Sequence, residues 1–312
     1  MTFNAGGKSY EIVEGLRDRI KPDWQEMLLP AKDRLGKIPS PSGFSPAVNM
    51  IEKNLEQFKE TMVDKYILEV GCNEGMRSFL MAKFQDTFVH GIDVDLYTVD
   101  QSPDMNNWNP EDQKFVHDMF YDVRSKIRDI FPESVAKKVT FQTIGIEDYK
   151  SISKHNLVIS WDTLEHIIDP PKAFNSMYEC MVSGAMAYHE YNPFFALNGG
   201  HSLCTLDFLY GHCVLSAEDF ERYVREIRPE EEKIDINFYH KCLNRATRAD
   251  IRKYAKDSGF EILYFNGIPT VKDKNWQLRV ENEILPEVQR IYPTVTLDDL
   301  ICDSVQLVMR KP

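Results

Sequence analysis

The sequence predicts an α/β fold, a mostly parallel β-sheet with helices between its strands. Short apolar segments alternate along the chain with amphipathic segments that have helical spacing. A turn with two glycines separates the first strand from the next helix, as expected where a strand leads into a crossover helix. The composition is that of a globular protein, with 43% hydrophobic and 28% charged residues in a chain of 312. These observations predict one sheet domain with an N-terminal helical extension and an inserted lid.

The first part of the chain, residues 1–60, is expected to form the helical extension. Residues 1–35 read as a helical lead with a break at Pro30. The stretch KIPSPSGFSP (37–46) has the prolines, serines and glycine of a loop. Residues 46–61 then carry apolar side chains at three- and four-residue spacing, which predicts an amphipathic helix.

The strands of the sheet are expected within residues 61–191 and 247–312. Each candidate is a short apolar run bounded by polar or helical stretches. The predicted strands are Tyr66–Val70, Thr87–Val94, Val139–Thr143, Leu157–Trp161, Ala185–Tyr191, Phe260–Phe265 and residues 303–312.

Helices are predicted between these strands. Met76–Phe84 resumes helical spacing, and residues 115–130 do so after a polar, irregular stretch at 101–114. Pro170–Pro171 opens another helix, because proline suits the first turn, and Gly184 is expected to end it.

The alternation of strands and helices pauses between residues 192 and 246, which we expect to form the inserted lid. Ser216 stands three residues before Asp219, a capping box at the start of a helix. Thr247 and Asp250 form a second cap, where the α/β pattern resumes.

The net charge, the length of the apolar runs and the cysteine pattern argue against several functional classes. The formal net charge is -12, so a nucleic-acid partner is not expected, since such proteins usually present a basic surface. No apolar run reaches the ~18 residues of a membrane span, and the N-terminus lacks a secretory pattern. The six cysteines include no CxxC pair. We therefore expect a cytoplasmic protein without a membrane partner.

The stretch Tyr66 to Phe84, YILEVGCNEGMRSFLMAKF, holds the most informative motif. Glu69 stands two residues before Gly71, and Gly75 follows four residues later. A glycine turn lets a ligand approach the backbone closely, and a helix start offers unpaired N–H groups. The dinucleotide fingerprint G-x-G-x-x-G lacks its third glycine here, which argues against a nicotinamide-dependent oxidoreductase. A carboxylate favours a ligand with ammonium or amide donors and would repel a pyrophosphate.

This motif resembles E/D-x-G-x-G-x-G, the first motif of the class I S-adenosylmethionine-dependent methyltransferases. Glu69, Gly71 and Gly75 match it, while Asn73 replaces the middle glycine. Asparagine tolerates positive φ better than most residues, so the turn can form. The resemblance implies that these residues and Cys72 bind the cofactor S-adenosyl-L-methionine. It also implies a seven-stranded, Rossmann-like sheet, mostly parallel, with an antiparallel last strand.

Two further segments extend the resemblance. The stretch HGIDVD ends the second predicted strand at Asp93 and Val94. In the family, an acid at this place holds the two ribose hydroxyls of the cofactor. A carboxylate suits this role because it can accept a hydrogen bond from each hydroxyl. The stretch TIGIEDY (143–149) resembles the segment that contacts adenine, which implies cofactor contacts for Ile146 and Glu147.

The stretch LVISWDTLEHIIDPPKAF (157–174) carries the closest resemblance. In relatives, the end of this strand lines the cofactor, and the segment after it faces the substrate. The resemblance therefore implies that Trp161 and Asp162 bind cofactor and that Glu165 and His166 begin the substrate-facing segment.

The end of the fifth predicted strand and the start of the lid have the sequence YHEYNPFFALNGGHSLCTLDFLYGHC (188–213). In this segment aromatic residues are interspersed with three histidines. Three interpretations stay open. His189 or His201 is a general base, two histidines bind a metal with Asp207 or Glu190, or these residues only pack the lid. The histidine spacings match no compact metal signature, so no metal ligands are predicted. His189 is the favoured base because it ends the fifth strand, where such sheets bind ligands.

Together these expectations describe a methyltransferase that acts on a small molecule by in-line displacement. An oxygen acceptor is favoured, because the catalytic candidates His166, His189 and His201 could remove a hydroxyl proton. The alternatives are N- or C-methyl transfer, with or without a metal, and a binding protein that retains the fold without catalysis. Residues 61–191 would be the cofactor-binding core, with 247–312 completing the sheet. The N-terminal helices could cap the pocket or pair two subunits into a homodimer.

Overall fold

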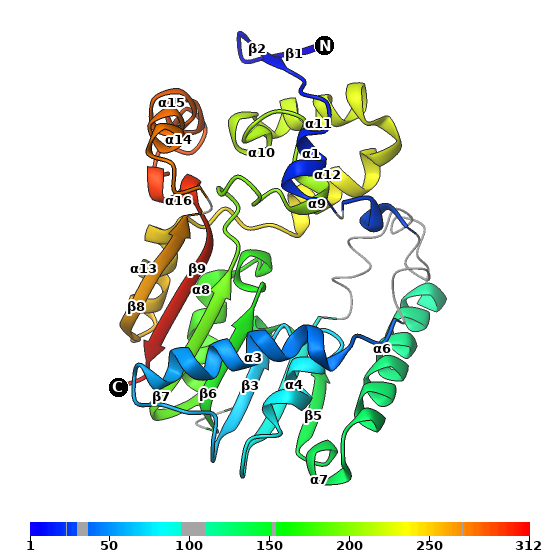
Figure 1. The fold of residues 1–312 in the computed structure, drawn as a ribbon, viewed down its shortest axis with the longest axis vertical. Helices are drawn as coiled ribbons and strands as arrows, with labels where there is room; N and C mark the ends of the chain where they lie inside the picture. Colours follow the sequence, from blue (N-terminus) through cyan, green and yellow to red (C-terminus); the bar gives the residue numbers. More distant parts are fainter. Residues whose placement is uncertain (23, 30–36, 95–109, 152–153, 270) are drawn as a thin grey trace.

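The computed structural model describes residues 1–22, 24–29, 37–94, 110–151, 154–269 and 271–312. Seven strands form one sheet in the order β5-β4-β3-β6-β7-β9-β8, seen in the lower half of Figure 1. This sheet confirms the predicted fold class. The strands are β3 (Tyr66–Val70), β4 (Phe88–Asp93), β5 (Val139–Thr143), β6 (His155–Trp161), β7 (Met181–Tyr191), β8 (Glu261–Pro269) and β9 (Cys302–Arg310).

The pairing of the strands is mostly parallel. Strands β5, β4, β3, β6 and β7 pair in parallel, while β9 runs antiparallel to both β7 and β8. Residues Ile67 to Val70 of the central strand β3 are all buried, as expected for a parallel strand covered on both faces. The chain order of the strands reverses between β3 and β6, so a crevice is expected at their carboxyl ends.

Helices cover both faces of the sheet (Figure 1). Apolar side chains of α3, α4 and α6 share one buried cluster with one face, and those of α8 and α13 share another with the opposite face. The two predicted caps form, since Ser216 and Thr247 accept the N–H groups of Asp219 and Asp250. The bounds are α3 (Pro41–Glu56), α4 (Met76–Met81), α6 (Pro110–Ile130), α7 (Glu133–Ala136), α8 (Pro170–Cys180) and α13 (Arg248–Asp257).

A cap stands above the carboxyl ends of the parallel strands, and β7 leads directly into it (Figure 1). We define the cap as the described residues of 1–29, 192–246 and 274–301, because their apolar side chains form one buried cluster. Its helices are α1 (Leu16–Ile20), α9 (His201–Cys204), α10 (Gly211–Val214), α11 (Ala217–Ile227), α12 (Glu232–Lys241), α14 (Lys274–Arg279), α15 (Leu285–Gln289) and α16 (Leu297–Ile301). Shorter turns are η1 (Trp24–Leu28), η5 (Pro229–Glu231) and the π-turn η6 (Val280–Ile284).

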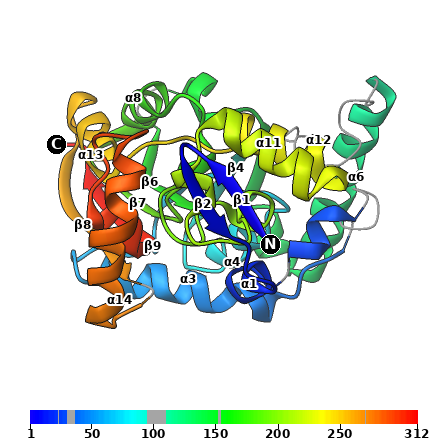
Figure 2. The ribbon, with the colours of Figure 1, turned by 90° about the horizontal axis from the view of Figure 1, so that it is seen from above.

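The structure corrects the helical lead that we predicted for residues 1–35. Strands β1 (Thr2–Ala5) and β2 (Lys8–Glu11) pair as an antiparallel hairpin over the cap, seen from above in Figure 2. Gly6 and Gly7 make its turn with positive φ, which non-glycine residues rarely adopt. Helix occurs only after this hairpin, and the break at Pro30 lies outside the described residues.

Two other local predictions were wrong. Helix α3 begins at Pro41, so the expected loop at 37–46 is helical over its second half. Gly184 does not end a helix, because α8 stops at Cys180 and Gly184 lies inside β7. Its φ of 81° falls where the pairing of β7 with β6 shifts register, so this glycine permits a β-bulge. In the described part of the chain, no helix is long and apolar enough to cross a bilayer.

Candidate functional site

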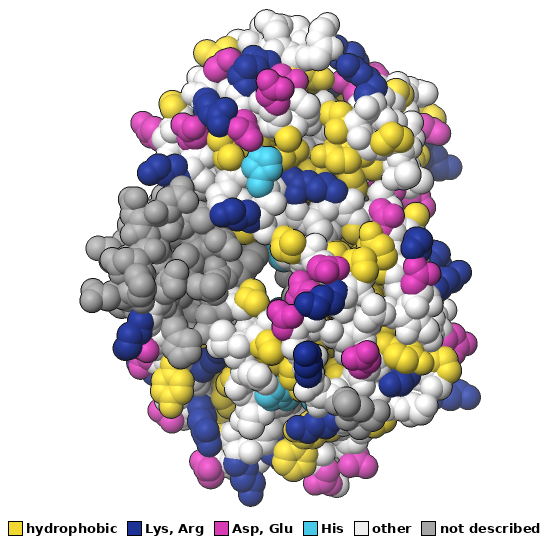
Figure 3. Space-filling view, turned by 180° about the vertical axis from the view of Figure 1, so that it is seen from behind, with side chains coloured by type: hydrophobic (Ala, Val, Ile, Leu, Met, Phe, Trp, Pro, Cys, Tyr) yellow, Lys and Arg dark blue, Asp and Glu magenta, His cyan; other side chains and the backbone are white. Residues whose placement is uncertain are grey.

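A cavity of about 410 Å³ lies at the carboxyl ends of β3, β4 and β6, on the side of the sheet that faces the cap. This is the switch point of the strand order, where open α/β sheets bind ligands. From behind, Figure 3 shows the surface hollowed between the cap and the sheet. Most of the predicted site residues line the cavity: Gly71, Cys72, Asn73, Gly75, Asp93, Val94, Ile146, Glu147, Trp161, Asp162 and His166.

The floor of the cavity is the turn between β3 and α4. Gly71, Asn73 and Gly75 adopt φ values of 74°, 48° and 84°. A Cβ on Gly71 would lie 2.2 Å from the hydroxyl oxygen of Thr163, so the ends of β3 and β6 approach too closely for any side chain there. Asn73 occupies the left-handed region, which confirms that asparagine can stand in for the middle glycine of this turn.

Asp93 at the end of β4 connects this turn to the second strand. Its carboxylate accepts the backbone N–H of Asn73 at 2.6 Å and that of Val94 at 2.7 Å. A carboxylate has about four lone-pair positions, so it can accept hydrogen bonds from ligand hydroxyls as well as from the backbone. The glycine cradle and this carboxylate together fit an adenosyl ligand, with room in a cavity of ordinary ligand-binding size.

Two arginines belong to the site, although sequence reasoning missed them. The guanidinium of Arg124 on α6 donates to the carbonyl oxygen of Asn73 at 2.7 and 3.0 Å. Arg77 on α4 donates to Glu69 at 3.2 Å. Arg77 lay within the quoted motif, but no local pattern pointed to Arg124, which folding brings to the turn. The lining residues that were not predicted as site residues are Phe44, Val70, Glu74, Met76, Arg77, Ile92, Arg124, Ile144, Gly145, Thr163, Ile167 and Ile168.

Glu69 requires a correction, because its carboxylate does not line the cavity. The side chain is buried, and it accepts hydrogen bonds from Arg77 and from the hydroxyl of Ser78. Burial raises the pKa of Glu69, and the charge of Arg77 opposes that shift. Glu69 therefore positions Arg77, which does line the cavity, and the start of α4.

The three catalytic candidates differ in their position relative to the cavity. His166 lines the cavity, and its Nδ1 lies 2.6 Å from the carbonyl oxygen of Cys242. A carbonyl only accepts, so Nδ1 carries the proton and Nε2 carries the lone pair. Burial lowers the pKa of His166 to about 4, so the ring is neutral at pH 7. His201 does not line the cavity, but its ring centroid is 4.8 Å from that of His166.

The favoured base, His189, is a wrong prediction. Its side chain is 0% exposed, lies outside the cavity lining and contacts Phe174 of α8. Its Nδ1 pairs with the hydroxyl of Ser160 at 2.7 Å, and burial lowers its pKa to about 3. The residue ends a strand as expected, but the alternation of β7 directs the side chain into the buried layer between sheet and helices.

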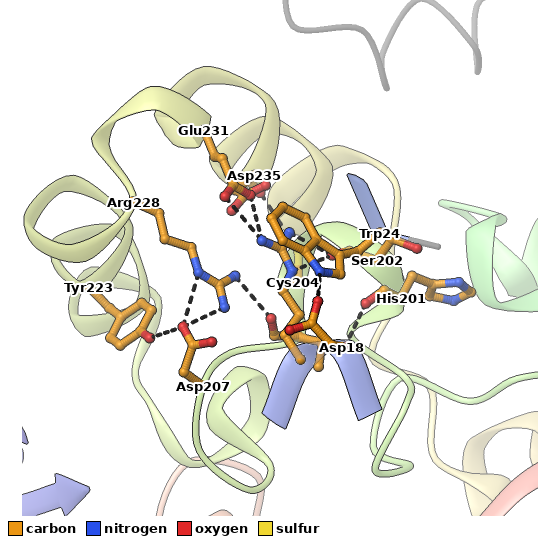
Figure 4. Close-up of polar contacts among 12 residues, drawn as sticks. Asp18, Trp24, His201, Ser202, Cys204, Asp207, Tyr223, Arg228, Glu231 and Asp235 are labelled. Atoms are coloured by element: carbon orange, nitrogen blue, oxygen red, sulfur yellow. Dashed lines mark hydrogen bonds and ion pairs between the residues drawn. The ribbon is translucent and has the colours of Figure 1, made fainter. Parts of the chain in front are cut away.

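The two acids that were considered as possible metal ligands, Asp207 and Glu190, are engaged elsewhere. Asp207 pairs with Arg228 at 2.6 Å and accepts the hydroxyl of Tyr223 at 2.6 Å in a cap network that Figure 4 shows. The carboxylate of Glu190 accepts the hydroxyl of Ser304 at 2.9 Å. Neither acid joins a histidine in a ligand set. Within the described residues, the close group of possible metal ligands is instead Glu165, His166 and His201.

A comparison with protein families agrees with this geometry. A family model described as "Methyltransferase domain" matches residues 47–264. Similar solved structures include an S-adenosylmethionine dependent methyltransferase from Mesorhizobium loti, with 10% identity, a TM-score of 0.46, and coverage of 87% of this chain and 100% of that chain. Magnesium protoporphyrin IX methyltransferase from Synechocystis has 14% identity, a TM-score of 0.46, and coverage of 87% of this chain and 84% of that chain. No curated protein sequence matches the chain.

Proposed function

The chain belongs to the methyltransferase-domain family, and from that premise we propose that it methylates an oxygen atom of a small molecule. It is an S-adenosylmethionine-dependent methyltransferase. When bound, S-adenosyl-L-methionine supplies a methyl group on a positively charged sulfur atom. The identity of the acceptor is the proposed part, and its main support is the neutral imidazole of His166 at the cavity.

The cofactor is proposed to lie across the turn at residues 71–75. The glycines allow close backbone approach, and Asp93 accepts hydrogen bonds from the two ribose hydroxyls. Val94 and Ile146 supply apolar surface for the adenine, with Glu147 beside them. Each of these residues comes from a strand end or the turn after it, so the sheet fixes their relative positions.

The other end of the cofactor is proposed to lie at Trp161 and Asp162, after β6. The guanidinium of Arg77 can pair with a carboxylate, and the carboxylate of Asp162 can accept an ammonium group. Cofactor binding at this place would direct the methyl group toward His166, on the turn that follows Asp162. In-line transfer then requires the acceptor to approach from the side of His166 and the cap.

His166 supports oxygen as the acceptor for a chemical reason. As a hydroxyl oxygen gains the methyl group, its proton becomes strongly acidic and must leave. The lone pair on Nε2 offers a place for that proton, and a pKa of about 4 suffices because the methylated oxygen is a much stronger acid. A small acceptor is favoured over a nucleic acid because the chain carries a net charge of -12.

The experiment is methyl transfer from isotopically labelled cofactor to fractionated small-molecule extracts, with the product identified by mass spectrometry and NMR. The expected product carries the label on oxygen. His166→Ala should lose turnover by ~10²-fold or more and retain its affinity for S-adenosylhomocysteine. His240→Ala, an exposed histidine of α12, should behave as wild type. Label on nitrogen or carbon would refute the oxygen assignment, and full turnover in the His166 variant would refute the role of His166.

A further inference from the structure

We propose that Glu165, His166 and His201 bind one divalent transition-metal ion at the acceptor end of the cavity. One possible ligand atom from each residue lies within 4.8 Å of the others. Glu165 and His166 belong to the 3-10 turn η4 (Leu164–His166) after β6, and His201 begins α9 in the cap. The set therefore joins the sheet to the cap, beside a cavity that His166 itself lines.

Glu165 is the first argument for an ion. Its side chain is 2% exposed. One carboxylate oxygen accepts the N–H of Asn192 at 3.0 Å, while Oε2 is buried with no hydrogen-bond partner among the described residues. A buried carboxylate oxygen without a partner costs free energy, and coordination of a cation would remove that cost.

The surroundings of the two histidine rings suit them as nitrogen ligands. The Nδ1–H of His166 donates to the carbonyl of Cys242, the outer contact that fixes ring orientation in metal-binding histidines. The Nε2 of His201 is buried, and no described group hydrogen-bonds to it. In Figure 4 the ring of His201 points away from the ion-pair network of the cap.

The backbone holds His201 in an unusual conformation. Its φ is 51°, in the left-handed region that residues other than glycine adopt only in a few per cent of cases, although histidine does so more often than most. Its N–H donates to Asn198 at 3.0 Å, and its carbonyl accepts the hydroxyl of Thr205 at 2.5 Å. Such strain persists where surrounding structure enforces it and is common at functional sites.

The ligand set indicates the class of metal. Two imidazoles and one carboxylate suit Zn²⁺, Mn²⁺, Fe²⁺ or Co²⁺ better than Mg²⁺ or Ca²⁺, which prefer oxygen. Bonds of about 2.0–2.2 Å would bring the ligand atoms to roughly 3–3.5 Å from one another, so small side-chain movements close the site. Lys21 acts electrostatically on all three residues, and Asp162 acts on Glu165 with the opposite sign.

The role of the ion rests on the proposed function, whereas its binding does not. A metal held by three protein ligands retains open coordination positions. An acceptor hydroxyl bound there would lose its proton more readily, because the ion stabilises the resulting oxyanion. With its lone pair on the ion, His166 would not take that proton itself; the proton would pass to water, and His166 would act on the acceptor through the ion.

The test uses the full chain, stripped with a chelator and titrated with Co²⁺ while the visible absorption is recorded. We expect one equivalent to bind, with bands typical of a nitrogen and oxygen ligand field. Glu165→Gln, which keeps shape, and His201→Ala should each weaken Co²⁺ binding at least tenfold. His240→Ala is the matched control and should bind as wild type.

Calorimetry with S-adenosylhomocysteine on the same samples separates this proposal from the proposed function. Variants that bind this ligand normally and lose Co²⁺ support the metal site, since His201 and Glu165 lie outside the cavity lining. Absence of a Co²⁺ spectrum in wild type would overturn the metal site. Equal Co²⁺ affinity in both variants would overturn it too, and loss of cofactor binding in wild type would count against the proposed function alone.

Discussion

The carboxylate of Asp93 accepts the backbone N–H of Asn73 at 2.6 Å, across a separation of 20 residues in the chain. This contact joins the end of β4 to the turn after β3, so the cofactor floor is built by two strands together. Arg124 holds the other side of Asn73 by donating to its carbonyl oxygen. The conformation of the turn is thus set by tertiary contacts as well as by its glycines.

Replacing Asp93 by alanine should weaken the binding of S-adenosylhomocysteine roughly thirty- to hundredfold. The variant loses charge-assisted hydrogen bonds, a change of about 2–3 kcal/mol. Isothermal calorimetry measures the effect. Asp257→Ala is the control, since Asp257 is an exposed acid on α13 that pairs with Lys253. An unchanged dissociation constant in a folded variant would remove Asp93 from the site.

The turn should distinguish two substitutions of Asn73. Asn73→Gly should bind S-adenosylhomocysteine within a few-fold of wild type, because glycine adopts a φ of 48° without strain. Asn73→Val should bind at least tenfold more weakly, since a β-branched residue there costs about 1–3 kcal/mol. Calorimetry on both variants makes the comparison. Equal affinities would mean that the left-handed conformation of Asn73 does not matter for the ligand.

Gly71 should be sensitive and Gly43 tolerant to alanine. In Gly71→Ala the new Cβ would lie 2.2 Å from the hydroxyl oxygen of Thr163, at a positive φ. We expect a loss of about 2–4 kcal/mol in the free energy of unfolding. Gly43 lies in α3 with nothing within 4 Å of such a Cβ, so Gly43→Ala should be neutral or stabilise by about 0.5–1 kcal/mol. Urea denaturation measures both, and equal stability of the two variants contradicts the packing argument.

His189 should act on stability rather than on turnover. Burial lowers its pKa from 6.5 to about 3, so below pH 6.5 the unfolded chain binds a proton that the folded chain does not. Stability is therefore lost as the pH falls from 6.5 toward 3, by up to about 1.4 kcal/mol per pH unit from this group. His189→Asn can keep the contact with Ser160 but cannot titrate.

The difference in unfolding free energy between wild type and His189→Asn, measured at several pH values, isolates this effect. As the pH decreases, wild type should lose more unfolding free energy than the variant. The affinity for the cofactor at pH 7 should be the same in both proteins. A difference that does not depend on pH would contradict the buried, neutral state of His189. Lost turnover with normal stability would restore the residue as a base.

Local patterns predicted the sheet well because each strand contains a short run rich in apolar residues. Tyr66–Val70 and Val139–Thr143 have the predicted bounds, and each lies between clear turn or helix signals. The hairpin at residues 2–11 was missed because its strands are short and polar, although the Gly6–Gly7 pair was a usable turn signal. Helices α14 to α16 bury their apolar residues against cap residues that are distant in the sequence. No local pattern reveals such a packing partner.

The candidate site also contains residues that local motifs predicted and residues that they did not. The turn, Asp93 and His166 follow from motifs within single segments, and the structure brings them to one cavity. Arg124 reaches the turn from a helix about fifty residues away, and His201 meets His166 across the interface of sheet and cap. Spacing cannot report such contacts, which arise only when the layers pack. The cytoplasmic location and the homodimer stay predictions.

The most direct test of the account is a crystal structure of the full chain with S-adenosylhomocysteine. We predict that the ligand lies across the turn from Gly71 to Gly75, with its ribose hydroxyls on the carboxylate of Asp93 and its sulfur facing His166. Density for the ligand at another place, or a turn that stays closed by its own side chains at saturating ligand, would contradict the central claim.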